Sequence, residues 1–323
     1  MKVLLLHGPD AAGPPADPVL DDVEGALAAA GHAVTRHTLG DDLAPFLHLV
    51  REQPPELVFN LTEDYAGKSA LDSSVASLMN LLGLRYTGAS HAGLLLAGDK
   101  ALAKKILSFH EVLTPQFATL HRGALESAGE LHFPLIVKPP QQDASIGITS
   151  ASVVRSPGEL LARLDEIHRE YRSPVLVEQF VEGREYYVGV LGNEQARALP
   201  VVELDMSGYP EGVPRVASWA AKWEAEHAEY GGSVTRFPED LAPELEARMQ
   251  ETALAAFHAL RLRDYARIDL RVSEDEAIHV IEVNPNCYLA RSEVFSLAAE
   301  RAGIPYEELI ARIADLASAR YSR

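Results

Sequence analysis

The sequence predicts a mixed α/β and α+β chain, with an N-terminal doubly wound α/β domain ahead of α+β structure. In the first third, short apolar runs alternate with helical patterns, which is typical of a parallel sheet covered by helices on both faces. From Gly98 onward this alternation gives way to strands that follow one another more closely. The length of 323 residues suggests two or three packed units.

The α/β part begins with a buried parallel strand, Lys2–Leu6, which enters a Gly- and Pro-rich loop at Gly8. A helix then runs from about Val19 to Ala30, because Gly31 is a usual residue just past a helix C-terminus. The further elements expected here are a strand at 33–35, a helix at 43–51, a strand at 57–60 and a helix at 73–82.

The α+β part begins with a helix that opens at Asp99-Lys100 and stops before Pro115. Residues 207–238 show little apolar period, and such stretches inside compact domains are more often functional than idle. The further elements expected here are strands at 133–139, 151–154, 175–178 and 185–191, and helices at 157–170, 243–260 and 305–319.

Two short segments near the C-terminus carry an unusual set of polar residues, Arg267-Ile268-Asp269 and Ile281-Glu282-Val283-Asn284. If the strands pair as a hairpin, alternation places Arg267 beside Asp269 on one face, and Glu282 beside Asn284. Oxygen donors at this density suit Mg²⁺, and a neighbouring arginine can stabilise charge on phosphoryl oxygens. The alternative is a solvated hairpin with a surface ion pair, although charged side chains are seldom buried without a partner.

The composition argues against several classes of function. The formal net charge is −18 and the pI about 5.1, whereas surfaces for nucleic acids or anionic membranes are expected to be basic. The single cysteine, Cys287, suits a reducing compartment, and with no adjacent histidine we expect it to pack rather than to react. No stretch approaches the ~20 apolar residues that span a bilayer, and the first apolar run is too short for a signal peptide. We expect a cytoplasmic protein.

A resemblance to a known family rests on five segments, which are, in order, LIVKPPQQDASIG, VLVEQFVEGREYYVGVLGN, AAKWE, YARIDL and IEVNPN. With them the chain resembles the ATP-grasp ligases, and within these the D-alanine–D-alanine ligases. The resemblance extends to VFNLT, LLGLRYTGAS and GDKALAKKIL in the first third, so it covers nearly the whole chain. Each motif alone is weak, but their conjunction in order is specific.

The resemblance implies an ATP-grasp fold in which two α+β lobes clamp ATP. The implied division is an N-terminal domain at 1–93, a central lobe at 94–178 and a C-terminal lobe with the metal site at 179–323. It implies an ADP-forming ligase: a carboxylate attacks the γ-phosphate to give an acyl phosphate, and an amine then attacks the acyl carbon. The implied cofactors are ATP and Mg²⁺, or Mn²⁺ in its place.

Site residues follow from the same motifs. Two phosphate lysines, an adenine acceptor with its neighbours and a ribose carboxylate are implied at Lys100, Lys138, Glu178, Gln179, Phe180, Val181 and Glu185. The implied metal ligands are Asp269, Glu282 and Asn284, and the implied catalytic residues are Arg267, Lys222 and Ser145. Plain alternatives remain, because strand-end lysines are usually solvated, Phe180 can be core, and Glu185 can form a weak surface pair with Arg184.

The first-substrate pocket departs from the family, in which a first-loop glutamate, a serine and a tyrosine bind the first D-alanine. This chain has only Asp10 and Asp17 in that loop, Ala144 at the serine position and Trp223 at the tyrosine position. A D-alanine first substrate is therefore in question. Asp143, where the family commonly has glycine, has no explanation.

The second-substrate pocket departs too, because a histidine and a serine of the family fall here at Glu63 and Glu293, with Arg291 nearby. A glutamate facing a substrate carboxylate would repel it by ~1–4 kcal/mol at about 4 Å. Glu293 can instead pair with Arg291 or face solvent.

The leading prediction is a carboxylate–amine ligase with altered substrate pockets. Two alternatives are a true D-alanine–D-alanine ligase and an ATP-binding partner or sensor that does not catalyse ligation. The expected partners are small-molecule carboxylate and amine substrates, with no nucleic acid and no membrane, and a homodimer, since the family tends to dimerise.

Overall fold

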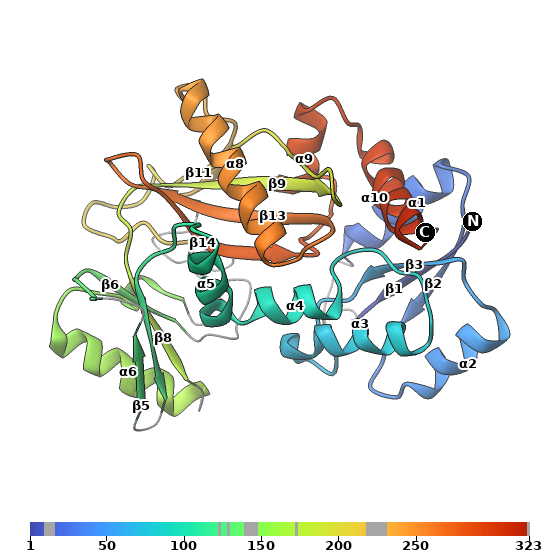
Figure 1. Cartoon of the computed structure of the whole chain (residues 1–323), viewed down its shortest axis with the longest axis horizontal. Coiled ribbons are helices and arrows are strands. Elements are labelled where there is room, and N and C mark those ends of the chain that lie inside the picture. Colours follow the sequence, from blue (N-terminus) through green and yellow to red (C-terminus); the bar gives the residue numbers. More distant parts are fainter. Residues whose placement is uncertain are drawn as a thin grey trace.

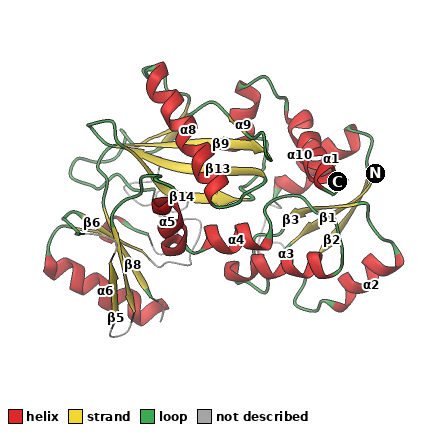
Figure 2. Ribbon diagram, viewed as in Figure 1, coloured by secondary structure: helices red, strands yellow, loops and turns green. Residues whose placement is uncertain are grey.

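The computed structural model describes residues 1–9, 17–121, 124–127, 130–138, 148–171, 174–217 and 231–321. Within them the strands form three sheets, which follow one another along the chain and are joined by helices (Figures 1 and 2). Six positions singled out in the sequence lie outside the described residues: Asp10, Asp143, Ala144, Ser145, Lys222 and Trp223.

The N-terminal elements are β1 (Lys2–His7), α1 (Pro18–Ala29), β2 (Ala33–Thr38), α2 (Ala44–Glu52), β3 (Leu57–Leu61) and α3 (Asp72–Leu81). The sheet is parallel, with the order β2-β1-β3. Successive side chains of β1 enter different cores: Val3 and Leu5 pack with α1, and Leu4 and Leu6 pack with α2 and α3. Helices therefore cover both faces, which confirms the predicted doubly wound arrangement.

The central sheet is antiparallel, with the order β5-β4-β8-β6-β7. Its region consists of α4 (His91–Gly98), α5 (Lys100–Phe109), β4 (Phe117–His121), β5 (Ala124–Ser127), β6 (Leu135–Lys138), β7 (Val153–Val154), α6 (Pro157–Tyr171) and β8 (Val175–Gln179). Helix α6 covers the face that carries Val137 and Val177. Because strand side chains alternate, the adjacent Lys138 and Glu178 point to the opposite face, where they meet.

The structure corrects three details of this middle region. The predicted strand at 151–154 is shorter, because residues 150–152 form a 3₁₀ turn. Helix α4 and the strands β4 and β5 have no counterpart among the expected elements. The α4 segment, HAGLLLAG, is apolar on nearly all sides, so it shows no amphipathic period to read.

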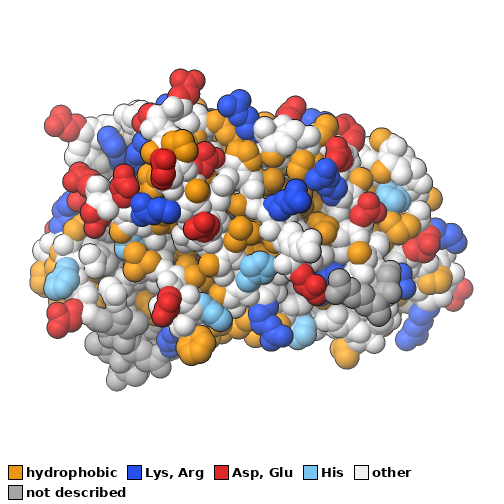
Figure 3. Space-filling model, turned by 45° about the horizontal axis from the view of Figure 1, so that its top comes forward, with side chains coloured by type: hydrophobic (Ala, Val, Ile, Leu, Met, Phe, Trp, Pro, Cys, Tyr) orange, Lys and Arg blue, Asp and Glu red, His pale blue; other side chains and the backbone are white. Residues whose placement is uncertain are grey.

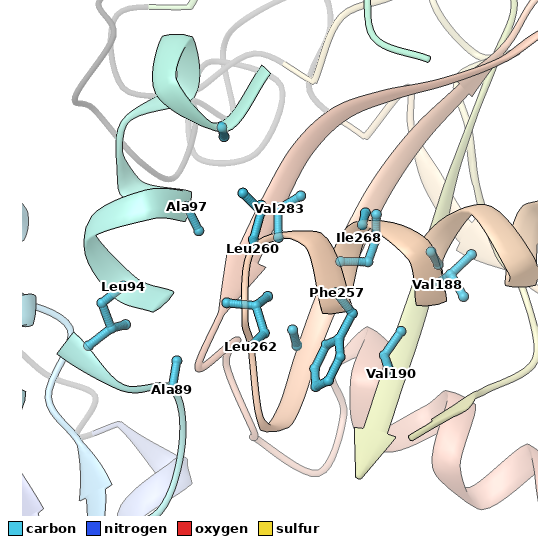
Figure 4. Close-up of a cluster of buried hydrophobic side chains, with 14 of the residues drawn as sticks. Ala89, Leu94, Ala97, Val188, Val190, Phe257, Leu260, Leu262, Ile268 and Val283 are labelled. Atoms are coloured by element: carbon cyan, nitrogen blue, oxygen red, sulfur yellow. The ribbon is translucent and has the colours of Figure 1, made fainter. Parts of the chain in front are cut away.

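The third sheet is antiparallel, with the order β12-β11-β9-β13-β14, and β10 pairs with β9. Its region consists of β9 (Arg184–Gly192), β10 (Arg197–Ala198), β11 (Val202–Asp205), β12 (Val234–Arg236), α8 (Pro243–Ala259), β13 (Asp264–Val272), β14 (Ile278–Pro285) and α9 (Val294–Arg301). Strand β12 lies inside the stretch 207–238, whose sequence shows little apolar period. Helix α8 covers one face of the sheet, where Val188, Phe257 and Ile268 meet in one core (Figure 4).

A β-bulge decides which side chains of β14 leave that core. Asp269 pairs with Glu282 and Leu270 pairs with Val280, so Ile281 is the extra residue. Strict alternation would put Val280 and Glu282 on the same face. With the bulge, Val280 stays buried in the α8 core while Glu282 faces the same side as Asp269.

The C-terminal helix α10 (Tyr306–Arg320) lies beside α1 and shares its core with the first sheet (Figure 1). An ion pair also joins α10 to the third sheet: Arg320 binds Asp264 at the start of β13, and the Gly88 amide donates to the other Asp264 oxygen at 2.7 Å. Asp264 is 0% exposed, and burial raises its pKa. The end of the chain thus fastens the first sheet to the third.

Acidic and basic side chains intermix on the face shown in Figure 3, with apolar groups between them. No helix among the described residues combines the length and the apolar character needed to cross a bilayer.

Candidate active site

The candidate site occupies the face of the third sheet that points away from α8. Residues 186, 188 and 190 of β9 lie in the α8 core, so residues 185 and 187 face the other way. The same alternation on β13 brings Arg267, Asp269 and Arg271 to this face. The predicted hairpin is therefore confirmed, and its polar side chains line one side of it.

Asp269 holds two of the predicted side chains in place. Arg267 donates to both of its oxygens, from Nε at 2.7 Å and from Nη2 at 2.9 Å, and Asn284 Nδ2 donates at 3.1 Å. The Arg267 guanidinium also lies 4.9 Å above the centroid of the Tyr187 ring. A fork-shaped pair with a stacked ring fixes the direction in which the guanidinium presents its remaining donors.

Glu282 lies opposite Asp269 across the strand pair and binds Lys100, with Oε1 2.9 Å from Nζ. Burial raises the pKa of Asp269 to about 6 against the opposing charge of Arg267, and the Glu282 charge adds to the rise. Burial would raise the pKa of Glu282 too, but Lys100, Lys138 and Arg267 lower it to about 2. Two carboxylates with this mutual repulsion fit a divalent cation, whose charge favours ionisation of both.

The donor set for such a cation contains two carboxylates and one amide. Among the residues that the structure describes, no three Asp, Glu, His or Cys side chains gather as a metal site. Asn284, bound to Asp269 through Nδ2, can offer its amide oxygen as a third donor, which leaves positions for phosphate oxygens and water, as Mg²⁺ usually requires.

Glu178 is buried between two lysines on the inner face of the central sheet. Its Oε2 lies 3.0 Å from Lys138 Nζ, and its Oε1 lies 3.3 Å from Lys104 Nζ. Burial would raise the pKa of Glu178, but the two lysines lower it, and burial lowers the pKa of Lys104. Lys138 and Glu178 were expected near one nucleotide, whereas Lys104 was not predicted.

Glu185 and its neighbours form the next part of the site. Glu185 accepts from Arg271 Nη2 at 2.9 Å and from the Tyr187 hydroxyl at 3.1 Å. The alternative, a surface pair of Glu185 with Arg184, is absent from the described contacts, in which Arg184 binds Glu203 and Asp240 instead. Phe180 is 8% exposed and lies beneath the Arg271 guanidinium, so it is both a core residue and a wall of this region.

Two residues predicted for the second substrate, Glu63 and Glu293, act electrostatically on Tyr288. The charges of Asp17, Glu293 and Glu63 all add to the effect of burial in raising the pKa of its hydroxyl, which also donates to Asp17. Glu63 is exposed, and Glu293 is half-buried at the N-cap of α9. Three acidic side chains thus lie within electrostatic range of one phenol.

Arg291 points elsewhere. It donates to Glu307 Oε1 at 2.8 Å and stacks 4.3 Å above the centroid of the Tyr306 ring, with Asp22 3.8 Å away. Within the described contacts no ion pair joins Arg291 to Glu293. Cys287 is buried and packs among apolar residues, as expected, and burial raises its pKa to about 12.

Three residues of the site were not predicted from the sequence: Lys104, Tyr187 and Arg271. Lys104 is one helical turn after Lys100, so helical spacing could have placed both lysines on the same face. Tyr187 and Arg271 sit two residues beyond Glu185 and Asp269, which is the strand period that puts them on the same face.

Known proteins match most of this chain in sequence and fold. A family model described as D-ala D-ala ligase C-terminus matches residues 106–315. An uncharacterised protein of Sinorhizobium fredii is 32% identical over 310 residues, which cover 94% of this chain and 88% of that protein. The D-alanine–D-alanine ligase of Desulforudis audaxviator is 32% identical over 300 residues and 91% of each chain.

Among solved structures, the D-alanine–D-alanine ligase from Bacillus anthracis complexed with ATP superposes with a TM-score of 0.77 at 22% identity. The match covers 99% of this chain and 98% of that one. The fold is therefore the ATP-grasp fold that the sequence predicted.

Proposed function

The chain belongs to the D-alanine–D-alanine ligase family, and from this we propose that it joins a carboxylate to an amine with ATP through an acyl phosphate. It is an ADP-forming ATP-grasp ligase of the C–N bond-forming type. The observation that carries the proposal is the Asp269 cluster, in which Arg267 is held by a bidentate pair beside Glu282 and Asn284. ATP recognition alone would not require that complete set.

The proposed reaction has two steps. A substrate carboxylate oxygen forms a bond to the γ-phosphorus, and the bond from that phosphorus to the β–γ bridging oxygen breaks, which releases ADP. The amine nitrogen then attacks the acyl carbon, phosphate leaves, and the nitrogen loses a proton. Both steps develop negative charge on phosphoryl or carbonyl oxygens, so positioned cations are what the site has to supply.

The residues on the polar face fit these requirements. Arg267 presents its free N–H groups in a direction fixed by Asp269 and Tyr187, which suits a transferring phosphoryl group. Asp269, Glu282 and Asn284 would hold Mg²⁺, which when bound neutralises charge on the phosphate oxygens. Lys100 and Lys138 lie next to these carboxylates and Glu178, and are proposed to bind phosphates. Lys222 and Ser145 remain predicted catalytic residues.

We propose further that the substrates are not two D-alanines. The charges of Glu63, Glu293 and Asp17 all act on the Tyr288 hydroxyl, and in this region an acceptor carboxylate would be repelled. Arg291, two residues before Glu293 in the chain, is directed to Glu307 and Asp22. An amine that is cationic away from its reacting nitrogen, or that lacks an α-carboxylate, fits this surrounding better. Trp223 stays a predicted residue of the first-substrate pocket.

The test is release of ADP and phosphate from ATP and Mg²⁺ across a panel of carboxylates and amines, with the ligated product identified by mass spectrometry. The proposal expects turnover with a pair other than D-alanine twice. The second candidate, a true D-alanine–D-alanine ligase, is favoured by the names of relatives such as the Desulforudis audaxviator protein. D-alanine alone would then sustain full turnover and yield the dipeptide.

A third outcome, ATP binding without phosphate release for any pair, would indicate the non-catalytic partner or sensor. The domain boundaries after residues 93 and 178, the cytoplasmic location and the homodimer also stay predictions.

A further inference from the structure

We propose that Arg271 is a positioning residue of the nucleotide site, which holds the Glu185 carboxylate in place for the ribose hydroxyls of ATP. The inference rests on the proposed function and on the ribose-binding role that the family resemblance implies for Glu185. None of the motifs that carry the family resemblance assigns a role to Arg271.

The position of Arg271 follows from the strand period. It is on β13, two residues beyond Asp269, and therefore on the face of the sheet that points away from α8. In the pairing of β13 with β9 its direct partner is Glu185. Arg271 is 4% exposed, so its charge is held by protein groups rather than by water.

Arg271 binds one oxygen of Glu185 through two nitrogens. Its Nε and Nη2 both donate to Oε2, at 3.2 and 2.9 Å. The Tyr187 hydroxyl donates to the other oxygen, Oε1, at 3.1 Å. An ionised carboxylate offers about four acceptor positions, so these three bonds leave Glu185 able to accept from a ligand hydroxyl. The carboxylate is thus fixed in direction without being saturated.

The same guanidinium reaches two other residues predicted to touch the nucleotide. Its Nη1 donates to the Val181 carbonyl at 3.0 Å, and its carbon lies 4.9 Å from the centroid of the Phe180 ring. It also donates to the Arg215 carbonyl. One planar fork therefore fixes the ribose acceptor and the aromatic wall beside it. A lysine has a single ammonium and cannot form all these bonds from one position.

The competing explanation is that Arg271–Glu185 is a buried ion pair that only stabilises the sheet. Loss of such a pair would lower the stability of the fold and would weaken the binding of every nucleotide to the same extent. A positioning role predicts something more specific. The effect of removing Arg271 has to depend on whether the nucleotide carries ribose hydroxyls.

The experiment measures dissociation constants by titration calorimetry with Mg²⁺, for ATP and for 2′,3′-dideoxy-ATP, so no acceptor or donor substrate is needed. The variants are Arg271→Met, which keeps length and loses the fork, and Arg271→Lys, which keeps charge. Arg312→Met is the matched control, because Arg312 forms an exposed pair with Glu308 on α10.

We expect Arg271→Met to weaken ATP binding by about 10-fold or more, the usual range for a hydrogen bond to a charged group. For the dideoxy nucleotide the same substitution should change the constant by less than about threefold, since the affected contact is already absent. Arg271→Lys should fall between wild type and Arg271→Met, and Arg312→Met should match wild type.

Equal losses for both nucleotides, or no loss for either, would overturn the positioning role. If Arg271→Met does not fold, Arg271→Lys decides the matter by the same comparison. If wild type binds ATP, these outcomes test the role of Arg271 alone and leave the proposed function unaffected. If wild type binds no ATP, the proposed function fails first.

Discussion

Asp269 and Glu282 are direct partners on adjacent strands, yet the pKa of Asp269 is raised and the pKa of Glu282 is lowered. Burial dominates at Asp269, whereas Lys100 has the largest opposing effect at Glu282. The pair therefore presents one firmly ionised carboxylate beside one whose ionisation a cation would favour. This arrangement fits a shared divalent ion better than it fits two independent surface charges.

Glu282→Gln should lower turnover by at least about 100-fold, because a positioned charge on the phosphoryl-transfer path is lost. Restoring activity should require more Mg²⁺ than wild type needs. ADP release over a Mg²⁺ titration measures both effects. Glu276→Gln is the control, since Glu276 is exposed in the turn of the same hairpin and pairs with Arg248. Full turnover by Glu282→Gln at low Mg²⁺ would remove Glu282 from the metal site.

Glu293→Ser should shift acceptor preference toward D-alanine by roughly tenfold, since removing one charge at about 4 Å relieves ~1–4 kcal/mol of repulsion. Competition between D-alanine and a panel of cationic amines at fixed ATP measures the shift. Glu300→Ser, exposed in the last turn of α9, is the control. The prediction is wrong if wild type already prefers D-alanine and the substitution changes nothing.

Asp264→Ala should lower the free energy of unfolding by about 2–4 kcal/mol, because it leaves the partly buried Arg320 guanidinium without its carboxylate partner. It also removes the acceptor of the Gly88 amide. Denaturant unfolding measures the change, and Asp315→Ala on the exposed face of α10 serves as control. A loss below about 1 kcal/mol would show that this junction is not a main attachment of the first sheet.

His279 should make stability fall as the solution is acidified. Burial lowers its pKa, the Thr114 backbone and Asp275 oppose that effect in part, and the charge of Lys104 adds a smaller lowering. The unfolded chain therefore takes up this proton at a higher pH than the folded chain. The contribution of neutral His279 to the free energy of unfolding is complete above the ordinary histidine pKa of about 6.5. It is lost as the pH falls toward the lower pKa that His279 has in the folded chain.

The measurement is urea unfolding at about pH 7.5 and about pH 5.5. His279→Gln should lose less stability between these two conditions than wild type does. His258→Gln, on the exposed side of α8, should resemble wild type. Identical pH dependence in wild type and His279→Gln would contradict the assignment.

Sequence pattern alone predicted much of the architecture. The apolar stretch at β1 and the glycine at position 31, just after α1, are local signals that need no distant partner, and both elements are observed. The strand period was also enough to place Arg267 with Asp269 and Glu282 with Asn284. Local spacing determines which residues share a face because the backbone period is the same wherever the strand packs.

Tertiary structure decided what each of these faces meets. The bulge at Ile281 turns Glu282 toward Asp269 while Val280 remains in the α8 core. The bulge is defined by how β14 pairs with β13, and no local motif in the sequence marks it. The pairing of β13 with β9 brings Arg271 to Glu185, 86 residues apart in the chain. Helix α10 lies against α1 because its apolar face fits the first sheet. The apolar period of α10 shows which face is buried, but it does not show which element covers that face. Contacts between distant segments depend on complementary surfaces, and those exist only once the chain has folded.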